Sequence, residues 1–485
     1  METVRSADER ASKAWQHPEV SQCPLAIMRN ADSEILAFGS QDQFTLPSCD
    51  LPARKRPAPI LLATIHAVLG LDAICRYSLP INPSELCFVL DLIDPDQPLS
   101  GDQFWLPVKN IRWDSVAPPV RDTLWSVLAR NNAYASGKLA GHFVSPGWLG
   151  PIQAWTQAAL APEGLHLTGA VGQYNIGPDF ALLRFATSGR AVWFKAVGHP
   201  NCHEFAITRE LSNFGLPHVP ELIAVDESLH AWLMYEAAGT FPGSCYSREQ
   251  WKWIARSLAE LQLASLPFVP ALASAGCCDL TIHRLEQRID SYLLETAGLM
   301  RLQTAEPPRR LTSENLRLMG RSLRTACRRM KRLAVPDSIG HSDFNAGNIL
   351  VRRGKAVFLD WAQGHIGPPC LTFEYLRLLV ARSCPADDAL MQEIRHEYLR
   401  VWASSAAGRD IAECLDLGPL LAVFAYAVVC HTAAGDFRSA NAESIGFLRS
   451  LARRIYREAQ ATAEGREPDH NKCADHCAGP PASSF

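Results

Sequence analysis

The sequence lacks the features that mark a secreted, membrane-spanning or polyanion-binding chain. Its formal net charge is only −3 over 485 residues, which gives no overall attraction to nucleic acid or to an anionic membrane. Its 15 cysteines are scattered without the spacing of a secreted disulfide framework. The longest apolar run, residues 418–435, falls short of a membrane-spanning helix. We therefore expect a cytoplasmic protein that binds neither nucleic acid nor membrane.

Length and pattern predict several domains, because 485 residues exceed one ordinary hydrophobic core. Residues 1–140 contain short apolar segments of strand length around one helix that closes at Gly70. Residues 141–240 carry further strand-like segments, and helical periodicity dominates residues 241–465. Residues 466–485 have the polar, Gly- and Pro-rich composition of disorder, and a chance cluster explains their Cys and His residues better than a zinc site does.

The first of these regions weakly resembles the Nudix hydrolases, since a small sheet is expected around one helix that ends in Gly-apolar. The resemblance covers residues from about 20 to 140. A Nudix hydrolase holds magnesium through glutamates on that helix, because Mg²⁺ prefers hard oxygen ligands. The corresponding segment here, Ala63–Val68, contains no carboxylate. The resemblance therefore implies a degenerate domain, structural or ligand-binding and without hydrolase activity.

A second stretch, "HSDFNAGNILV" followed by "AVFLDW", gathers candidate catalytic groups. Asp343 and Asn348 are five residues apart, and Asp360 follows Asp343 by seventeen. The two apolar segments predict a two-stranded ribbon that brings these three side chains to one end. Phosphoryl transfer from ATP needs such a set: an acceptor for the hydroxyl proton and two oxygen ligands for a metal. The alternative is an Asx-rich turn whose side chains bond only local backbone.

This stretch resembles the catalytic loop of the aminoglycoside phosphotransferase family of small-molecule kinases, and the resemblance extends over residues from about 145 to 460. Ser342 stands where the family usually has Gly. Trp361 and Ala362 follow Asp360 in place of the Phe-Gly of protein kinases, which favours the small-molecule branch. The resemblance implies an α+β, protein-kinase-like fold with a β-rich N-lobe and a helical C-lobe. It also implies ATP and Mg²⁺ as cofactors, with Asp343 as catalytic base.

The resemblance implies further parts of a nucleotide site. Lys195 is the cation of the apolar strand "AVWFKAV" and needs an anionic partner; it matches the phosphate-binding lysine of the family. Glu204 is the expected partner, with Glu210 as the competitor. Two other contacts are assigned by position along the chain. The backbone of Tyr235 and Ala237 is expected to bind adenine, and Gly172 is expected to lie in a hairpin that covers the phosphates.

Two functions stay open. The first is an ATP-dependent phosphotransferase that acts on a hydroxyl of a small molecule, with Asn348 and Asp360 as metal ligands. The second is a nucleotide-binding sensor without turnover. In both, His341 is expected to fix the backbone by hydrogen bonding. The basic run at residues 324–333 is expected to be a solvated helix face, since that is what such runs usually are.

Overall fold

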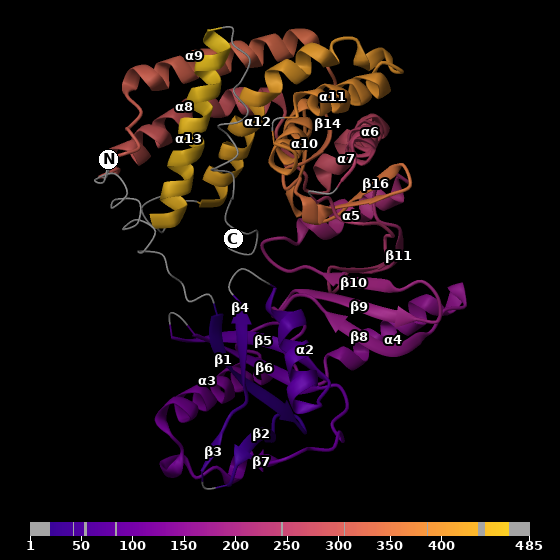
Figure 1. The fold of residues 1–485 in the computed structure, drawn as a ribbon, viewed down its shortest axis with the longest axis vertical. Helices are drawn as coiled ribbons and strands as arrows, with labels where there is room; N and C mark the ends of the chain where they lie inside the picture. The colour runs from indigo at the N-terminus through magenta and orange to yellow at the C-terminus, as the bar shows by residue number, and fades with distance from the viewer. Residues whose placement is uncertain are drawn as a thin grey trace. The chain divides into compact units, whose positions relative to one another are not determined.

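The protein forms two compact units in a computed structural model (Figure 1). The first unit comprises residues up to Phe205 together with Leu222–Glu236, and the second comprises Ala206–Glu221 together with Ala237 onward. The tail expected to be disordered lies outside the described residues. The structure describes residues 20–464 except 42, 53–55, 83–84, 244–245, 305, 386 and 435–441.

The first unit opens with a seven-stranded sheet in the order β3-β2-β1-β6-β5, with β4 paired to β1 and β7 paired to β2. Strands β1 and β6 are parallel, and the other described pairs in this sheet are antiparallel. The strands are β1 (Val20–Arg29), β2 (Glu34–Gly39), β3 (Phe44–Thr45), β4 (Ser48–Pro52), β5 (Ala73–Asn82), β6 (Glu85–Leu92) and β7 (Gln103–Pro107).

One helix packs on each face of this sheet. Alternate residues of β1 enter two different cores, as the two-residue period of a strand requires. Helix α2 (Pro57–Leu69) packs in one core and ends at Gly70, whose φ of 67° is left-handed. Helix α3 (Pro118–Ala135) packs in the other. The sequence predicted α2 and missed α3.

A second sheet of the first unit has five antiparallel strands in the order β11-β12-β10-β9-β8. Helix α4 (Leu149–Leu160) shares a buried core with one face of it. Helix α5 (His203–Asn213) follows the strand that carries Lys195 and begins in the first unit and ends in the second. The strands are β8 (Leu167–Gln173), β9 (Ala181–Thr187), β10 (Val192–Ala196), β11 (Leu222–Asp226) and β12 (Ala231–Tyr235).

The second unit is mainly helical and has one large apolar core. Its helices are α6 (Arg248–Ser265), α7 (Val269–Ser274), α8 (Ile282–Arg301), α9 (Ser313–Leu333), α10 (Cys370–Ser383), α11 (Asp388–Trp402), α12 (Ile411–Ala434) and α13 (Ala442–Ala463). Its short strands are β13 (Cys278–Asp279), β14 (Ser338–His341), β15 (Ile349–Arg352), β16 (Lys355–Phe358) and β17 (Gly364–Gly367). A β-rich part followed by a helical part confirms the predicted α+β class.

Helix α12 corrects one expectation from the sequence. Its apolar stretch, Ile411–Thr432, has 22 residues and is long enough to cross a membrane by length and composition. The apolar run appeared too short because Ile411 and the turns after it belong to the same helix. However, 78% of its 18-residue apolar segment is buried inside the fold, where residues such as Leu421 and Phe424 belong to the core of the second unit. A core helix accounts for this pattern.

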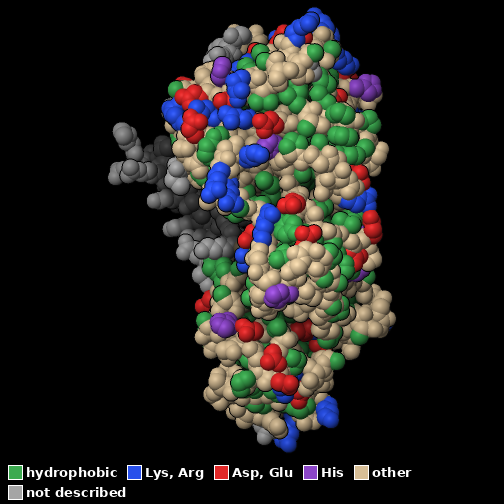
Figure 2. Space-filling view, turned by 90° about the vertical axis from the view of Figure 1, so that its right-hand side faces the viewer, with side chains coloured by type: hydrophobic (Ala, Val, Ile, Leu, Met, Phe, Trp, Pro, Cys, Tyr) green, Lys and Arg blue, Asp and Glu red, His purple; other side chains and the backbone are tan. Residues whose placement is uncertain are grey.

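The basic run on α9 is paired with acidic residues from neighbouring helices. Arg329 lies 2.9 Å from Glu413, Arg324 pairs with Asp290, and Lys331 pairs with Glu286. On the face shown in Figure 2, Lys and Arg side chains are intermixed with Asp and Glu. Exposed pairs of this kind contribute little to stability, and the contacts fit a solvated helix face.

Candidate active site

The loop after β14 holds the carboxylate of Asp343 between two side-chain amides. Asn345 donates from Nδ2 to Oδ1 of Asp343 at 2.7 Å, and Asn348 donates from Nδ2 to Oδ2 at 3.0 Å. Asn345 also accepts a hydrogen bond from the backbone N–H of Gly347, at 2.8 Å, and so caps the short helix η5 (Ala346–Asn348). Both carboxylate oxygens are therefore oriented. The sequence interpretation missed Asn345, although an Asn two residues after an Asp is a turn signal.

The ribbon predicted after this loop is present, and it joins Asn348 to Asp360. Strands β15 and β16 pair antiparallel from Ile349 opposite Phe358 onward. Next to this pair the N–H of Leu359 donates to the carbonyl of Asn348 at 2.8 Å, so that Asp360 follows directly. Asp360 has a left-handed φ of 64°, which a non-glycine residue keeps only where its surroundings hold it. The ribbon thus brings the chain at Asp360 next to Asn348, whose side chain contacts Asp343.

His341 is buried next to the catalytic loop and the end of the ribbon, and it is 1% exposed. Its Nε2 lies 2.9 Å from the carbonyl oxygen of Leu359, and its backbone N–H donates to Oγ1 of Thr372 at 2.8 Å. Its ring lies 4.9 Å from that of Trp361. Burial lowers the pKa of His341, so the ring is neutral and donates to Leu359. These contacts are those of a residue that fixes the backbone.

A second buried histidine lies behind the loop and was not anticipated. Strand β17 pairs antiparallel with β14, opposing His365 to Gly340. The Nδ1 atom of His365 lies 2.9 Å from Oγ of Ser342, the residue that departs from the usual glycine. Burial is the main cause that lowers the pKa of His365 to about 3. A Cβ on Gly340 would come within 2.2 Å of His365, so the glycine makes room for this ring.

The first unit contains the predicted lysine and its partner. Nζ of Lys195 lies 2.5 Å from Oε1 of Glu204, with side chains 14% and 3% exposed. The ammonium also lies 5.5 Å from the centre of the Trp232 ring, within the range of a cation–π contact. Glu210 instead lies 3.2 Å from Arg209. The structure therefore places Glu204, and not Glu210, against Lys195.

Two arginines contact the end of β12, the strand expected to bind adenine. Tyr235 ends β12 with the guanidinium of Arg190 4.7 Å from its ring centre. The next residue, Glu236, accepts two hydrogen bonds from Arg184, at 2.5 and 3.0 Å, and this pairing lowers the pKa of Glu236. Glu236 was missed from the sequence because its partner is 52 residues away. Ala237 follows it and belongs to the second unit.

Gly172 lies within β8 and not at the tip of the hairpin. It is opposite Arg184 on β9, and the connection between the two strands spans residues 174–180. Its φ is not positive, unlike that of Gly169, which is 94°. The assignment of Gly172 to the nucleotide phosphates stays a prediction.

The predicted site residues fall into two sets, each within its own unit. The first unit holds Gly172, Lys195, Glu204 and Tyr235, and the second holds Ala237, Asp343, Asn348 and Asp360. Within the described part of the chain, no three His, Cys, Asp or Glu side chains gather as a metal cluster. The candidate ligands are instead one carboxylate and one amide oxygen. Such a sparse hard-oxygen set fits Mg²⁺, which keeps waters and substrate phosphates among its ligands.

Comparison with known proteins finds one family model that matches part of the chain. Residues 199–407 match the model of the phosphotransferase enzyme family, APH. The matched range includes Glu204, Asp343, Asn348 and Asp360, and it confirms the resemblance to that family over these residues. The match supports a small-molecule phosphotransferase. It begins after the N-terminal sheet, which it leaves without an assignment.

The solved structures that the chain matches include phosphotransferases and kinases. Macrolide 2'-phosphotransferase MphH from Brachybacterium faecium is 14% identical, with a TM-score of 0.40 over 62% of this chain and 98% of that one. Spectinomycin phosphotransferase APH(9)-Ia, solved with ADP and spectinomycin, is 13% identical, with a TM-score of 0.37 over 64% and 98%. Choline kinase from Cryptosporidium parvum Iowa II is 12% identical, with a TM-score of 0.42 over 62% and 91%. No curated protein matches the sequence.

Proposed function

We propose that the protein is an ATP-dependent phosphotransferase that moves the γ-phosphate of ATP to a hydroxyl group of a small molecule. The observation that carries this proposal is the geometry at Asp343, whose two carboxylate oxygens are oriented by amides while Asp360 follows the same ribbon. A cytoplasmic location is proposed with it, on the cysteine pattern of the sequence.

In the proposed reaction the acceptor oxygen forms a bond to the γ-phosphorus, and the bond from that phosphorus to ADP breaks. The hydroxyl proton passes to the carboxylate of Asp343, which Asn345 and Asn348 hold in one orientation. Lys195, itself oriented by Glu204, neutralises charge on the nucleotide phosphates. Most of the rate enhancement then comes from positioning and charge neutralisation, as in other phosphoryl transfers.

Asn348 and Asp360 are the residues that would hold Mg²⁺. The amide nitrogen of Asn348 faces Asp343, so its amide oxygen, the atom that can bind a metal, points away from that carboxylate. When bound, the ion supplies positive charge beside the phosphates. In this division of roles, Asn348 and Asp360 would bind the metal. Asp343, whose oxygens are oriented by amides, accepts the hydroxyl proton.

The test is ATP consumption by the purified full-length protein with a panel of small hydroxyl and amine compounds. We expect turnover with at least one hydroxyl acceptor. Asp343→Asn should lower kcat by about 10²–10⁴-fold, the usual contribution of a general base, while the matched surface variant Asp416→Asn leaves it unchanged. A kcat in Asp343→Asn that equals that of wild type would exclude the catalytic assignment.

The second candidate is a nucleotide sensor without turnover. It is favoured by one observation, since helix α2 of the N-terminal sheet has no acidic residue in its first turn and none along Ala63–Val68. An N-terminal sheet whose helix lacks carboxylates is consistent with a regulatory chain. The same assay separates the two functions, because a sensor binds Mg-ATP in calorimetry but consumes none with any acceptor.

A further inference from the structure

Strand β5 of the N-terminal sheet contains a bulge at Arg76. Its register against β6 shifts between Cys75 and Tyr77, so Arg76 is the extra residue of the bulge. Because β5 is the last strand of its sheet, the backbone of Cys75 would be unpaired on its outer side. An edge of this kind needs a partner when it is buried.

The partner is a side chain from the second sheet of the same unit. Gln173, the last residue of β8, is 4% exposed. Its Oε1 accepts from the N–H of Cys75 and its Nε2 donates to the carbonyl of Cys75, each at 2.8 Å. The side-chain amide thus pairs with β5 as a further strand would, and both of its polar groups are satisfied.

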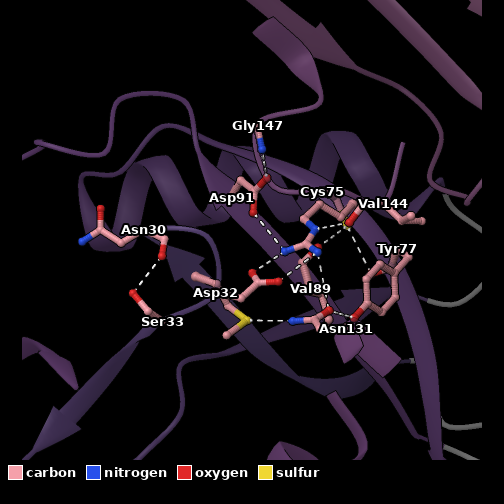
Figure 3. A network of polar contacts seen from close by, with 12 residues as sticks. Asn30, Asp32, Ser33, Cys75, Tyr77, Val89, Asp91, Asn131, Val144 and Gly147 are labelled. Carbon is pink, nitrogen blue, oxygen red and sulfur yellow. Dashed lines mark hydrogen bonds and ion pairs between the residues drawn. The ribbon is translucent and has the colours of Figure 1, made fainter. Parts of the chain in front are cut away.

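The bulge residue makes a second attachment through a buried charge network (Figure 3). The side chain of Arg76 is 1% exposed and pairs with the carboxylates of Asp32 and Asp91. Its Nε donates to the carbonyl of Val144 at 2.6 Å, and Asp91 accepts from the N–H of Gly147 at 2.9 Å. Figure 3 shows Asp32, Asp91, Val144 and Gly147 converging on this centre. The network fixes the segment that leads into α4.

Apolar contacts flank these two attachments. Ile74, the residue before Cys75, is 2% exposed and belongs to the core under the second sheet. Ile176, in the connection after β8, packs against the core of the N-terminal sheet. Ile74 and Cys75 of β5 therefore bind the second sheet by apolar packing and backbone pairing. Arg76, the next residue, binds the segment that leads into α4 through a buried ion network.

We infer that the N-terminal sheet is a positioning element of the phosphotransferase, and that Gln173 is the positioning residue through which it holds the β8–β9 hairpin. Gln173 directly follows Gly172 and directly precedes the connection 174–180. Loss of its amide would leave the N–H and carbonyl of Cys75 buried without partners, which is costly. The catalytic consequence rests on the proposed function, in which this hairpin lies over the nucleotide phosphates. It gives the N-terminal sheet a role that needs no catalytic carboxylate.

The chain offers a matched control at the other end of β8. Gln157 of α4 also bridges backbone groups with its side-chain amide, accepting from the N–H of Leu167 at 2.9 Å and donating to the carbonyl of Leu165 at 3.4 Å. It holds the start of β8, whereas Gln173 holds the end. Gln173→Met and Gln157→Met in the full chain each keep side-chain volume and remove one such bridge.

Hydrogen exchange is the primary measurement because it needs no catalysis. We expect amides 174–183 to exchange about tenfold faster in Gln173→Met, and to be unchanged in Gln157→Met, where the start of β8 loosens instead. In ATP turnover, Gln173→Met should raise the KM for ATP about tenfold with kcat nearly unchanged. Gln173→Asn, which keeps the amide, provides a milder variant if the methionine variant fails to fold, and it should shift both readouts in the same direction.

The inference is overturned if amides 174–183 exchange no faster in the Gln173 variants than in Gln157→Met. It is also overturned if both substitutions raise the KM for ATP equally, since Gln173 would then act only through general stability. A wild-type protein that neither binds nor consumes ATP refutes the proposed function, and in that case hydrogen exchange alone decides whether Gln173 holds the hairpin.

Discussion

Two groups of carboxylates in the molecule differ in their partners and in their exposure to solvent. In the first unit, Asp32 and Asp91 close around Arg76, whose side chain is 1% exposed. In the second unit, Asp343 is oriented by neutral amides and remains half-buried. A carboxylate that is buried against a buried arginine is out of reach of a substrate and serves to hold structure, whereas the half-buried carboxylate of Asp343 can be reached by a hydroxyl group. Orientation without neutralisation is the mark of the candidate catalytic group.

The stability of the two units should also depend differently on pH. The largest expected effect on the free energy of unfolding comes from His365. Its pKa, lowered to about 3 mainly by burial, is below its ordinary value of 6.5, so the unfolded chain binds the proton more readily than the folded one. Stability is therefore fully present above pH 6.5 and is lost as pH falls toward 3. The shift corresponds to about 4–5 kcal/mol.

The measurement is urea unfolding of wild type and His365→Asn between pH 7 and pH 4. We expect the wild type to lose stability more steeply than the variant over this interval. His283→Gln on the surface of α8, where the ring contacts Gln287, should follow the wild type. Equal slopes for wild type and His365→Asn would contradict the lowered pKa.

Breaking the network of the first unit should come next in magnitude. Arg76→Met leaves Asp91 buried and Asp32 partly buried without their cation, and loss of one partner of a buried pair costs about 3–5 kcal/mol. Arg324→Met serves as the control, because Arg324 and Asp290 are 42% and 82% exposed and such a pair contributes less than about 1 kcal/mol. Chemical denaturation at pH 7 gives both values. Similar losses in the two variants would show that the Arg76 network is not special.

A network could be predicted from the sequence when its residues lie close together in the chain, and it was missed when they lie far apart. The Asp343 loop was predicted because its residues lie close together in the chain and its ribbon has two apolar segments. The Arg76 network was not predicted, since arginine is usually exposed and its partners Asp32 and Asp91 are 44 and 15 residues away. Strand β17 was missed because it has four residues, two of them glycine.

The helices show the same dependence on local pattern. Helix α2 was predicted because its apolar residues end at a glycine in the left-handed conformation. Helix α3 was missed because it begins with two prolines and continues through "RDTLWSVLARNNAYA", whose polar residues leave no continuous apolar stripe. Tertiary packing of Leu124 and Val127 against the sheet makes it a helix. The pairing of Lys195 with Glu204 was anticipated from order along the chain, and only the structure decided against Glu210.

A third effect, opposite in sign to that of His365, is expected at Asp91. Burial is the main cause that raises the pKa of Asp91 to about 6 from 3.8, so the folded chain binds this proton more tightly than the unfolded chain. Its contribution to stability is fully present below pH 3.8 and is lost as pH rises through 6, a change of about 2–3 kcal/mol.

Asp91→Asn should remove this dependence, so that the difference in unfolding free energy between wild type and variant changes between pH 4 and pH 7. Asp72→Asn, at a site whose carboxylate is 54% exposed, should show no such change. A constant difference for Asp91→Asn would mean that Arg76 compensates the carboxylate fully, and the pKa of Asp91 would then be ordinary.

The smallest effect, and the one that connects stability to the site, is expected at Ser342. Ser342→Ala removes the hydroxyl bonded to Nδ1 of His365 and leaves that nitrogen buried without its partner, a loss of about 1–2 kcal/mol. Ser322→Ala removes another buried serine of the second unit, bonded to the carbonyl of Ala459 at 3.3 Å, and should cost a similar amount. Because only Ser342 adjoins Asp343, only Ser342→Ala should also lower kcat, by about tenfold with the KM for ATP unchanged. Equal kcat values in the two variants would show that the Ser342–His365 pair supports the fold without orienting the carboxylate.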